Sequence, residues 1–184
     1  MQTGVENMKQ TNGEYLYNIM RGYNNNTKET AEFTKRFDKK ACSYLDKFNN
    51  TLLQNAISSE KYDIAKFLIE KECNLDHQDD RGHTALDYLL GGYNDSESKL
   101  YDELLDGLLK KDIDLSLENK YGNQALWTAV KNAKIPLKII EKLLKKGAEP
   151  HHKNASDTSP YDMVQIYNIK ELSNLFKPYR KDSK

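Results

Sequence analysis

The chain has no long hydrophobic run and no excess of charge of either sign. A membrane-spanning helix needs a run of about 18 apolar residues, and none occurs. The 28 basic and 28 acidic residues give a formal net charge of zero. No overall electrostatic field therefore draws the chain toward nucleic acid or anionic lipid, and we expect no nucleic acid and no membrane as partner.

Cysteine, arginine and leader-like segments are also scarce. The two cysteines, Cys42 and Cys73, are too few for a disulfide framework, and we expect both to be reduced and structural. The first residues show no basic region followed by an apolar run, so no cleaved secretory signal is predicted. We expect a cytoplasmic protein, or one secreted into a host cell without a cleaved signal peptide. Few arginines and many asparagines are typical of an AT-rich genome, which favours a bacterial or viral source.

The sequence contains no recognisable catalytic or metal-binding constellation. It has no glycine-rich phosphate loop, no G-x-S-x-G elbow and no H-E-x-x-H helix. His77, His151 and His152 have no partner at metal-ligand spacing, so neither a metal nor any other cofactor is expected. One alternative stays open, a thiol enzyme that uses Cys42 and His83.

What the sequence does contain is repetition. Four segments open with a polar residue and an apolar pair, and their first residues lie 33, 40 and 35 positions apart: residues 51–56, 84–89, 124–129 and 159–164. Periods of this size indicate an array of helical repeats. A hydrophobic content of 38% and a mean hydropathy of −0.86 predict a thin core, whereas 12 Tyr and 5 Phe at zero net charge argue against disorder.

Each opener is followed by a second apolar stretch, as in residues 64–69 and 137–144. The chain resembles the ankyrin repeat, whose pattern is G-x-T-P-L-H-x-A, an I-V-x-x-L-L helix, and then G-A and a turn. Residues 82–86 (GHTAL) and 147–148 (GA) are the nearest matches, and the likeness covers residues 49 to 177. It implies an all-α solenoid of helical repeats. The histidine that ties neighbouring turns together in this family is replaced by Gln54, Asp87, Trp127 and Asp162.

The predicted organisation follows from these repeats and from the apolar spacing before them. Tyr15, Leu16, Ile19, Met20 and Tyr23, and then Phe33, Phe37, Ala41, Tyr44, Leu45 and Phe48, mark two helices that we expect to cap the first repeat. The second repeat carries about seven extra residues near 91–96, which we expect in a loop. The predicted divisions are a flexible N-terminus (1–12), capping helices (13–48), repeats (49–81, 82–121, 122–156 and 157–177) and a basic tail (178–184).

Charge is segregated along the array. Residues 95–118 hold eight acidic residues against three Lys, whereas residues 131–153 hold seven Lys against two Glu. We interpret these as two outer helices whose opposite charges help neighbouring repeats to stack.

The resemblance also implies a concave platform of hairpin tips and inner helices that binds another protein. Arg81, Tyr88 and Tyr121 are its expected central contacts, because Arg and Tyr anchor interfaces well. The predicted partner-binding residues are Asp80, Arg81, His83, Tyr88, Lys120, Tyr121, Asn123, Thr128, Lys131 and Asn132. We predict a non-enzymatic protein-binding module, monomeric when free, that acts as a single-target inhibitor or adaptor, such as a toxin-immunity protein or a host-directed effector.

Overall fold

The fold is all-α. The computed structural model describes residues 11–21, 27–93, 96 and 98–180. Over these residues it has ten α-helices, two 3-10 helices and no β-strand. The helices are α1 (Asn12–Met20), α2 (Thr27–Arg36), η1 (Lys39–Ser43), α3 (Leu52–Ser58), α4 (Tyr62–Glu70), α5 (Ala85–Gly91), α6 (Ser98–Leu109), α7 (Ala125–Lys131), α8 (Leu137–Lys145), α9 (Pro160–Tyr167), α10 (Lys170–Phe176) and η3 (Lys177–Tyr179). Most of the predicted flexible N-terminus, most of the basic tail, and Tyr23 lie outside the described residues.

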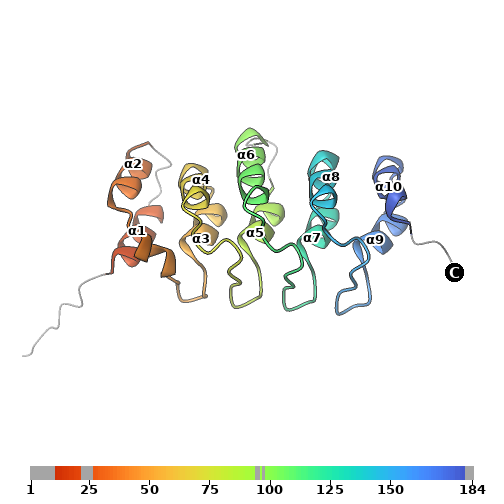
Figure 1. The fold of residues 1–184 in the computed structure, drawn as a ribbon, viewed down its shortest axis with the longest axis horizontal. Helices are drawn as coiled ribbons and strands as arrows, with labels where there is room; N and C mark the ends of the chain where they lie inside the picture. Colours follow the sequence, from red (N-terminus) through yellow and green to blue (C-terminus); the bar gives the residue numbers. More distant parts are fainter. Residues whose placement is uncertain (1–10, 22–26, 94–95, 97, 181–184) are drawn as a thin grey trace, which may run out of the picture.

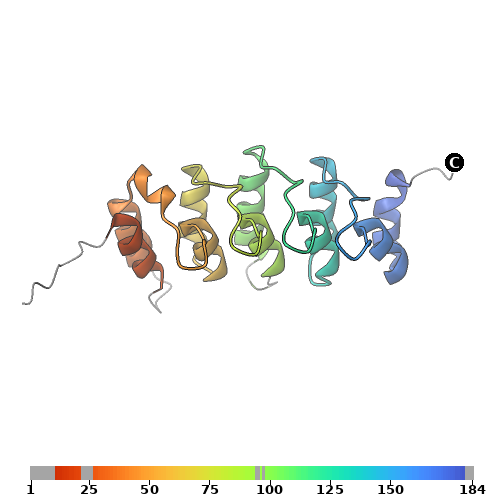
Figure 2. The same cartoon turned by 90° about the horizontal axis from the view of Figure 1, so that it is seen from below.

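The helices form two layers in one row. Helices α1, α3, α5, α7 and α9 make the inner layer, in which each helix contacts the next (Figure 1). Helices α2, α4, α6, α8 and α10 make the outer layer, and each pair is joined by a short connection. Viewed at right angles, the loops that link successive pairs lie side by side across the inner helices (Figure 2).

The inner helices begin where the sequence predicts. Thr51, Thr84 and Ser159 each accept a hydrogen bond from the third residue of the helix that follows, and that residue's side chain accepts one from the cap's backbone N–H. These reciprocal capping boxes satisfy first-turn amides that have no partner within the helix. The helix after Gln124 has no side-chain cap, although it begins at the predicted place.

The core is a continuous apolar layer between the two rows of helices. Leu53, Leu68, Leu105, Leu126 and Leu143 are all fully buried, and they come from both inner and outer helices. Such residues repeat along the array, so that each helix pair buries its apolar faces against its neighbours.

The N-terminal helix pair packs on α3 and α4, but its second helix is shorter than predicted. Helix α1 contacts α3 and α2 contacts α4, and Phe33 is completely buried. The expectation of one helix through Phe48 is wrong, because α2 ends at Arg36. Asp38 then caps a new 3-10 turn by accepting from the Ala41 N–H at 3.1 Å, which redirects the chain.

The expectation of two reduced cysteines is also wrong, because Cys42 and Cys73 form a disulfide. Cys42 lies in η1 and Cys73 follows α4, and their Cα atoms are 4.9 Å apart. Glu72 and Asn74 adopt left-handed backbone with φ of 55° and 48°, which turns the chain back toward η1. The Asn74 side chain also donates to the Cys42 carbonyl at 2.9 Å. The bond therefore joins the N-terminal segment covalently to the first repeat.

The extra residues of the second repeat do not all form a loop. Helix α6 has 12 residues, whereas α4 and α8 have 9 each. Part of the insertion therefore lengthens a helix. Tyr93, just after α5, is only 5% exposed and packs edge-on against Tyr101 at a ring-centroid distance of 4.5 Å.

The prediction that outer helices carry complementary charges is confirmed. Lys142 of α8 pairs with Asp106 of α6 at 2.6 Å, and Lys138 pairs with Asp102. Lys66 of α4 pairs in the same way with Glu103 of α6 at 2.8 Å. Opposite charges thus link neighbouring helix pairs on the outer face.

Candidate functional site

Four turns with the same geometry lie between successive helix pairs. Each spans five residues, 46–50, 79–83, 119–123 and 154–158, and each is closed by a backbone hydrogen bond from the first residue's N–H to the fifth residue's carbonyl. The turns extend from the inner layer as the loops on its open side (Figure 1).

The first residue of each turn is Asp or Asn, and its side chain holds the turn together. In the second turn, Asp79 Oδ1 accepts from the backbone N–H groups of Arg81 and His83, both at 2.8 Å. The same pair of bonds recurs at Asp46, Asn119 and Asn154. Short Asp and Asn side chains suit this position because they can bond backbone amides two residues ahead.

The fourth residue of each turn has a positive φ. Its values are 63° at Asn49, 79° at Gly82, 71° at Gly122 and 55° at Asp157. Gly, Asn and Asp tolerate this left-handed conformation best. Gly82 is needed for a second reason, since a Cβ there would lie 2.8 Å from the Asn119 Cα.

Backbone hydrogen bonds also join each turn to the next. Lys120 N–H donates to the Arg81 carbonyl at 2.9 Å, and Ala155 N–H donates to the Tyr121 carbonyl at 2.9 Å. Asp80 N–H donates to the Phe48 carbonyl at 3.3 Å. We call the second and third residues of the four turns the tip row, which consists of Lys47, Phe48, Asp80, Arg81, Lys120, Tyr121, Ala155 and Ser156.

The tip row exposes side chains that proteins usually bury. Phe48 is 57% exposed and Tyr121 is 66% exposed, and Arg81 is exposed between them. Aromatic and Arg side chains fixed on a rigid frame provide large contact areas at low entropic cost. The arrangement is suited to binding a macromolecular surface.

Half of the predicted partner-binding residues are exposed. Four lie in the tip row, Asp80, Arg81, Lys120 and Tyr121, and Lys131 lies at the end of α7. The Lys131 ammonium is 4.8 Å from the centroid of the half-buried Trp127 ring.

The other five are held within the fold. The Tyr88 hydroxyl donates a hydrogen bond to the Asp79 carboxylate at 2.8 Å, and His83 packs edge-on against the Tyr88 ring. Asn123 is only 6% exposed. Asn123 accepts from Asn154 at 2.7 Å, Asn132 donates to the Leu90 carbonyl at 2.9 Å, and Thr128 contacts Asp87 at 3.4 Å.

The carboxyl groups behind the tip row have perturbed pKa values. Burial raises the pKa of Asp79, but hydrogen bonds from the His83 N–H, the Tyr88 hydroxyl and the Arg81 N–H outweigh it, so its pKa lies below the usual range. Burial raises the pKa of the Tyr88 hydroxyl, and its bond to Asp79 adds to this effect. At Asp87, burial dominates and raises the pKa. The Asp79 carboxylate therefore accepts the hydrogen bonds that hold the second turn together.

Phe48 is a tip-row residue that the sequence analysis missed. Its spacing after Phe33 and Phe37 fits a helical face, so it was assigned to a capping helix. The signal that identifies it is the pattern of the turn itself, an Asp or Asn at the first position and a Gly, Asn or Asp at the fourth. Asp46 and Asn49 fit this pattern 33 positions before Asp79 and Gly82.

The residues of the thiol-enzyme alternative have other partners here. The Cys42 sulfur is bonded to Cys73, and neither of the chain's two cysteines is free. His83 Nδ1 lies 3.8 Å from Asp79 Oδ2. Across the described part of the chain, no cluster of His, Cys, Asp and Glu side chains is arranged to hold a metal ion. No helix in the same part has both the length and the apolar character needed to cross a bilayer.

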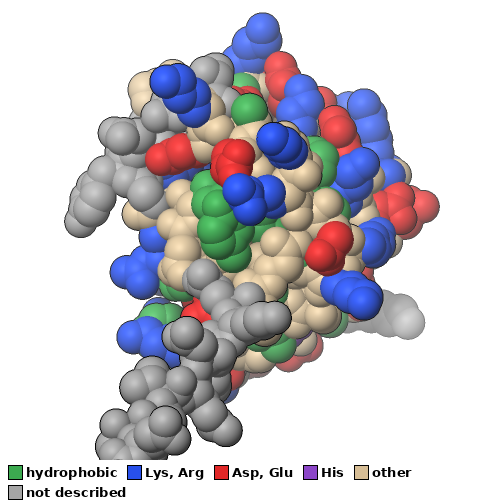
Figure 3. All heavy atoms as spheres, turned by 90° about the vertical axis from the view of Figure 1, so that its left-hand side faces the viewer, with side chains coloured by type: hydrophobic (Ala, Val, Ile, Leu, Met, Phe, Trp, Pro, Cys, Tyr) green, Lys and Arg blue, Asp and Glu red, His purple; other side chains and the backbone are tan. Residues whose placement is uncertain are grey.

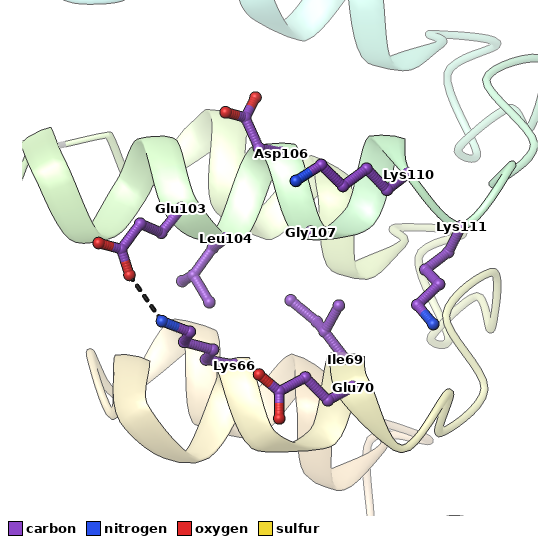
Figure 4. Close-up of a pocket in the computed structure, with 9 residues that line it drawn as sticks. All are labelled: Lys66, Ile69, Glu70, Glu103, Leu104, Asp106, Gly107, Lys110 and Lys111. Carbon is purple, nitrogen blue, oxygen red and sulfur yellow. Dashed lines mark hydrogen bonds and ion pairs between the residues drawn. The ribbon is translucent and has the colours of Figure 1, made fainter.

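A hollow of about 450 Å³ lies on the other side of the molecule, between α4 and α6 (Figure 4). Ile69 and Leu104 form its floor but are only 3% and 1% exposed. Its rim mixes Lys and Glu or Asp side chains, and the Lys66–Glu103 ion pair bridges one end. Because its rim mixes charges of both signs and its floor residues are almost fully buried, the hollow favours no class of ligand.

No protein-family model matches this chain, and no curated protein matches it in sequence.

Proposed function

We propose that this chain is a non-enzymatic ankyrin-type repeat protein that binds another protein through the tip row and the adjacent inner-helix face. In this proposal residues 49–81, 82–121, 122–156 and 157–177 are the repeats, residues 13–48 are an N-terminal cap, and the free protein is a monomer. It works in a cytoplasm, either its own or that of a host cell it enters.

The repeated order of turn, inner helix and outer helix supports the ankyrin-type assignment. So does the side chain that replaces the family histidine in the first repeat. Gln54 Nε2 donates to the carbonyls of His77 and His83 at 3.1 and 2.8 Å, and so ties one turn to the next. The buried indole N–H of Trp127, at the equivalent place in the third repeat, has no hydrogen-bond partner among the described residues.

The chemistry of the N-terminal end supports the role of a cap. The end of the row formed by α1 and α2 carries Lys, Arg, Asp and Glu side chains around a small hydrophobic patch (Figure 3). Phe33, on the side that meets the first repeat, is fully buried. Terminal units of a repeat array need such a polar outer face.

One observation supports the protein-binding proposal most directly. Phe48, Arg81 and Tyr121 are exposed in one row, on turns whose backbone N–H groups are already hydrogen-bonded. Each turn is held by its own Asp or Asn side chain, so the exposed residues are not required to hold the frame. Tyr and Arg are enriched among the residues that contribute most of the binding energy at protein interfaces.

An array of four repeats is small for a scaffold with several clients, so we favour a single-target inhibitor or adaptor. An immunity protein that neutralises a toxin and an effector delivered into a host cell both fit this role. The neighbouring genes distinguish them, because an immunity gene should directly adjoin a toxin gene. The alternative, a thiol enzyme using Cys42 and His83, requires that the disulfide first be reduced.

Quantitative affinity capture from the native cell tests the proposal. We expect Arg81→Ala and Tyr121→Ala each to weaken capture of the specific partner by about 1 to 3 kcal/mol with little change in melting temperature. The double variant Cys42→Ser/Cys73→Ser serves as control, and it should retain the partner. Loss of biological activity in that folded double variant, with both tip-row variants active, would favour the thiol enzyme instead.

A further inference from the structure

We propose that the tip row recognises an extended, acidic protein segment that also carries an apolar side chain. This inference rests on the proposed protein-binding function and specifies the chemistry of the partner.

Within the tip row, basic side chains outnumber acidic ones and form no ion pair in the described part of the chain. Lys47, Arg81 and Lys120 make no ion pair with any residue that the structure describes. The row contains one carboxylate, that of Asp80, against these three cations. Lys131, at the far end of α7, is a further exposed cation without an ion pair in the described part of the chain.

On the outer face, by comparison, four lysines are matched with acidic residues of neighbouring helix pairs: Lys66 with Glu103, Lys111 with Glu72, Lys138 with Asp102 and Lys142 with Asp106. These four lysines are thus paired, whereas the three basic side chains of the tip row are not. Interfaces are arranged so that such a positive patch meets a negative one.

The aromatic residues indicate what else the segment must present. Phe48 and Tyr121 each follow a lysine, and the Lys47 ammonium lies 4.8 Å from the Phe48 ring centroid. A cation beside an exposed ring suits a segment in which a carboxylate is close to an apolar or aromatic side chain.

The geometry of the row favours an extended segment. Successive turns are joined by backbone hydrogen bonds of 2.9 to 3.3 Å, so that their tips follow one another along the array (Figure 2). Because the Asp and Asn side chains fix each turn, binding orders little of this protein, and the cost of association is reduced.

Selection from a displayed library of random 12-residue peptides tests the inference. The purified full-length protein is the bait, and the enriched peptides are then synthesised and titrated. We expect enriched peptides to be rich in Asp and Glu with at least one aromatic or aliphatic residue. Arg81→Ala and Tyr121→Ala should each weaken their binding about tenfold, and the affinity should fall as salt concentration rises. Lys145→Ala, which removes one positive charge from the outer face, is the matched control and should change affinity less than about twofold.

The other outcomes separate the inference from the proposed function. If the enriched peptides were neutral or basic, and the tip-row variants still weakened their binding, the preference for an acidic segment would be wrong. The proposal that the tip row binds protein would stand. If no peptide depended on Arg81 or Tyr121, both ideas would fail. A single-stranded oligonucleotide is titrated in parallel, and its tight, tip-row-dependent binding in the absence of enriched peptides would point to nucleic acid instead.

Discussion

At the residue scale, a single Asp or Asn side chain in each turn replaces contacts that would otherwise have to come from distant parts of the chain. Asp79 differs from its equivalents Asn119 and Asn154 because its second carboxylate oxygen also accepts from the Tyr88 hydroxyl at 2.8 Å. The second turn is therefore tied to α5 as well as to itself. Its stability should depend on the ionisation of one buried carboxyl group.

Asp79→Asn tests this dependence on pH. Because the folded pKa of Asp79 is lowered, the stability it contributes is fully present above the unfolded pKa of about 4 and is lost as pH falls through the lower folded pKa. We expect the variant to lose about 1 to 2 kcal/mol of unfolding free energy near pH 7, with a smaller loss near pH 3. Urea denaturation at both pH values measures the difference. Asp80→Asn is the exposed control, and an equal loss in the two variants would contradict the argument.

Gly82 and Gly147 separate two effects of glycine. Both have positive φ, 79° and 93°, but only at Gly82 would a Cβ meet a neighbouring backbone atom, the Asn119 Cα at 2.8 Å. Gly147→Ala should cost about 1 kcal/mol, the conformational term alone. Gly82→Ala should cost at least about 1 kcal/mol more, since the second and third turns must move apart. Denaturant melts of the two variants would disprove this if their losses were equal.

At the scale of single elements, local chemistry explains which parts of the fold could be predicted from the sequence. The inner helices were placed correctly because Thr51, Thr84 and Ser159 cap the helices that directly follow them. The sequence predicts a longer helix after Arg36 because Ala41 and Leu45 continue a helical spacing. The side chain of Asn12, distant in sequence, donates to the Arg36 carbonyl and to the Asp38 carboxylate where the helix ends. The disulfide was missed because 31 positions separate its cysteines, and only the folded chain brings them together.

The disulfide gives the N-terminal elements a stability that their packing alone does not. Closing a loop of this size should stabilise the protein by about 2 to 4 kcal/mol, so reduction should lower the unfolding free energy by that amount. Chemical denaturation with and without reductant measures it. The double variant Cys42→Ser/Cys73→Ser should be insensitive to reductant. A parent protein that unfolds identically in both conditions would show that the bond contributes nothing.

At the scale of the whole molecule, the two faces have different tasks. The outer face matches charges between neighbouring helix pairs, as Lys142 and Asp106 do. On the side with the turns, backbone groups are hydrogen-bonded within and between turns, and side chains such as Arg81 and Tyr121 are exposed. The charge blocks that predicted the first feature are visible in sequence. The second feature was predicted only in part, because burial of Asn123 and exposure of Phe48 depend on how the turns stack.

The bond between Cys42 and Cys73 has a mechanical consequence. A row of helix pairs in which each contacts only its neighbours yields to a pulling force from its ends, one pair after another. The 31 positions that the disulfide spans cannot lengthen while the bond is intact. An oxidised chain that is pulled from its two termini therefore ends about 100 Å shorter than a reduced one. Helices α3 and α4 lie within this span, and they bear no load even after every later pair has been drawn out.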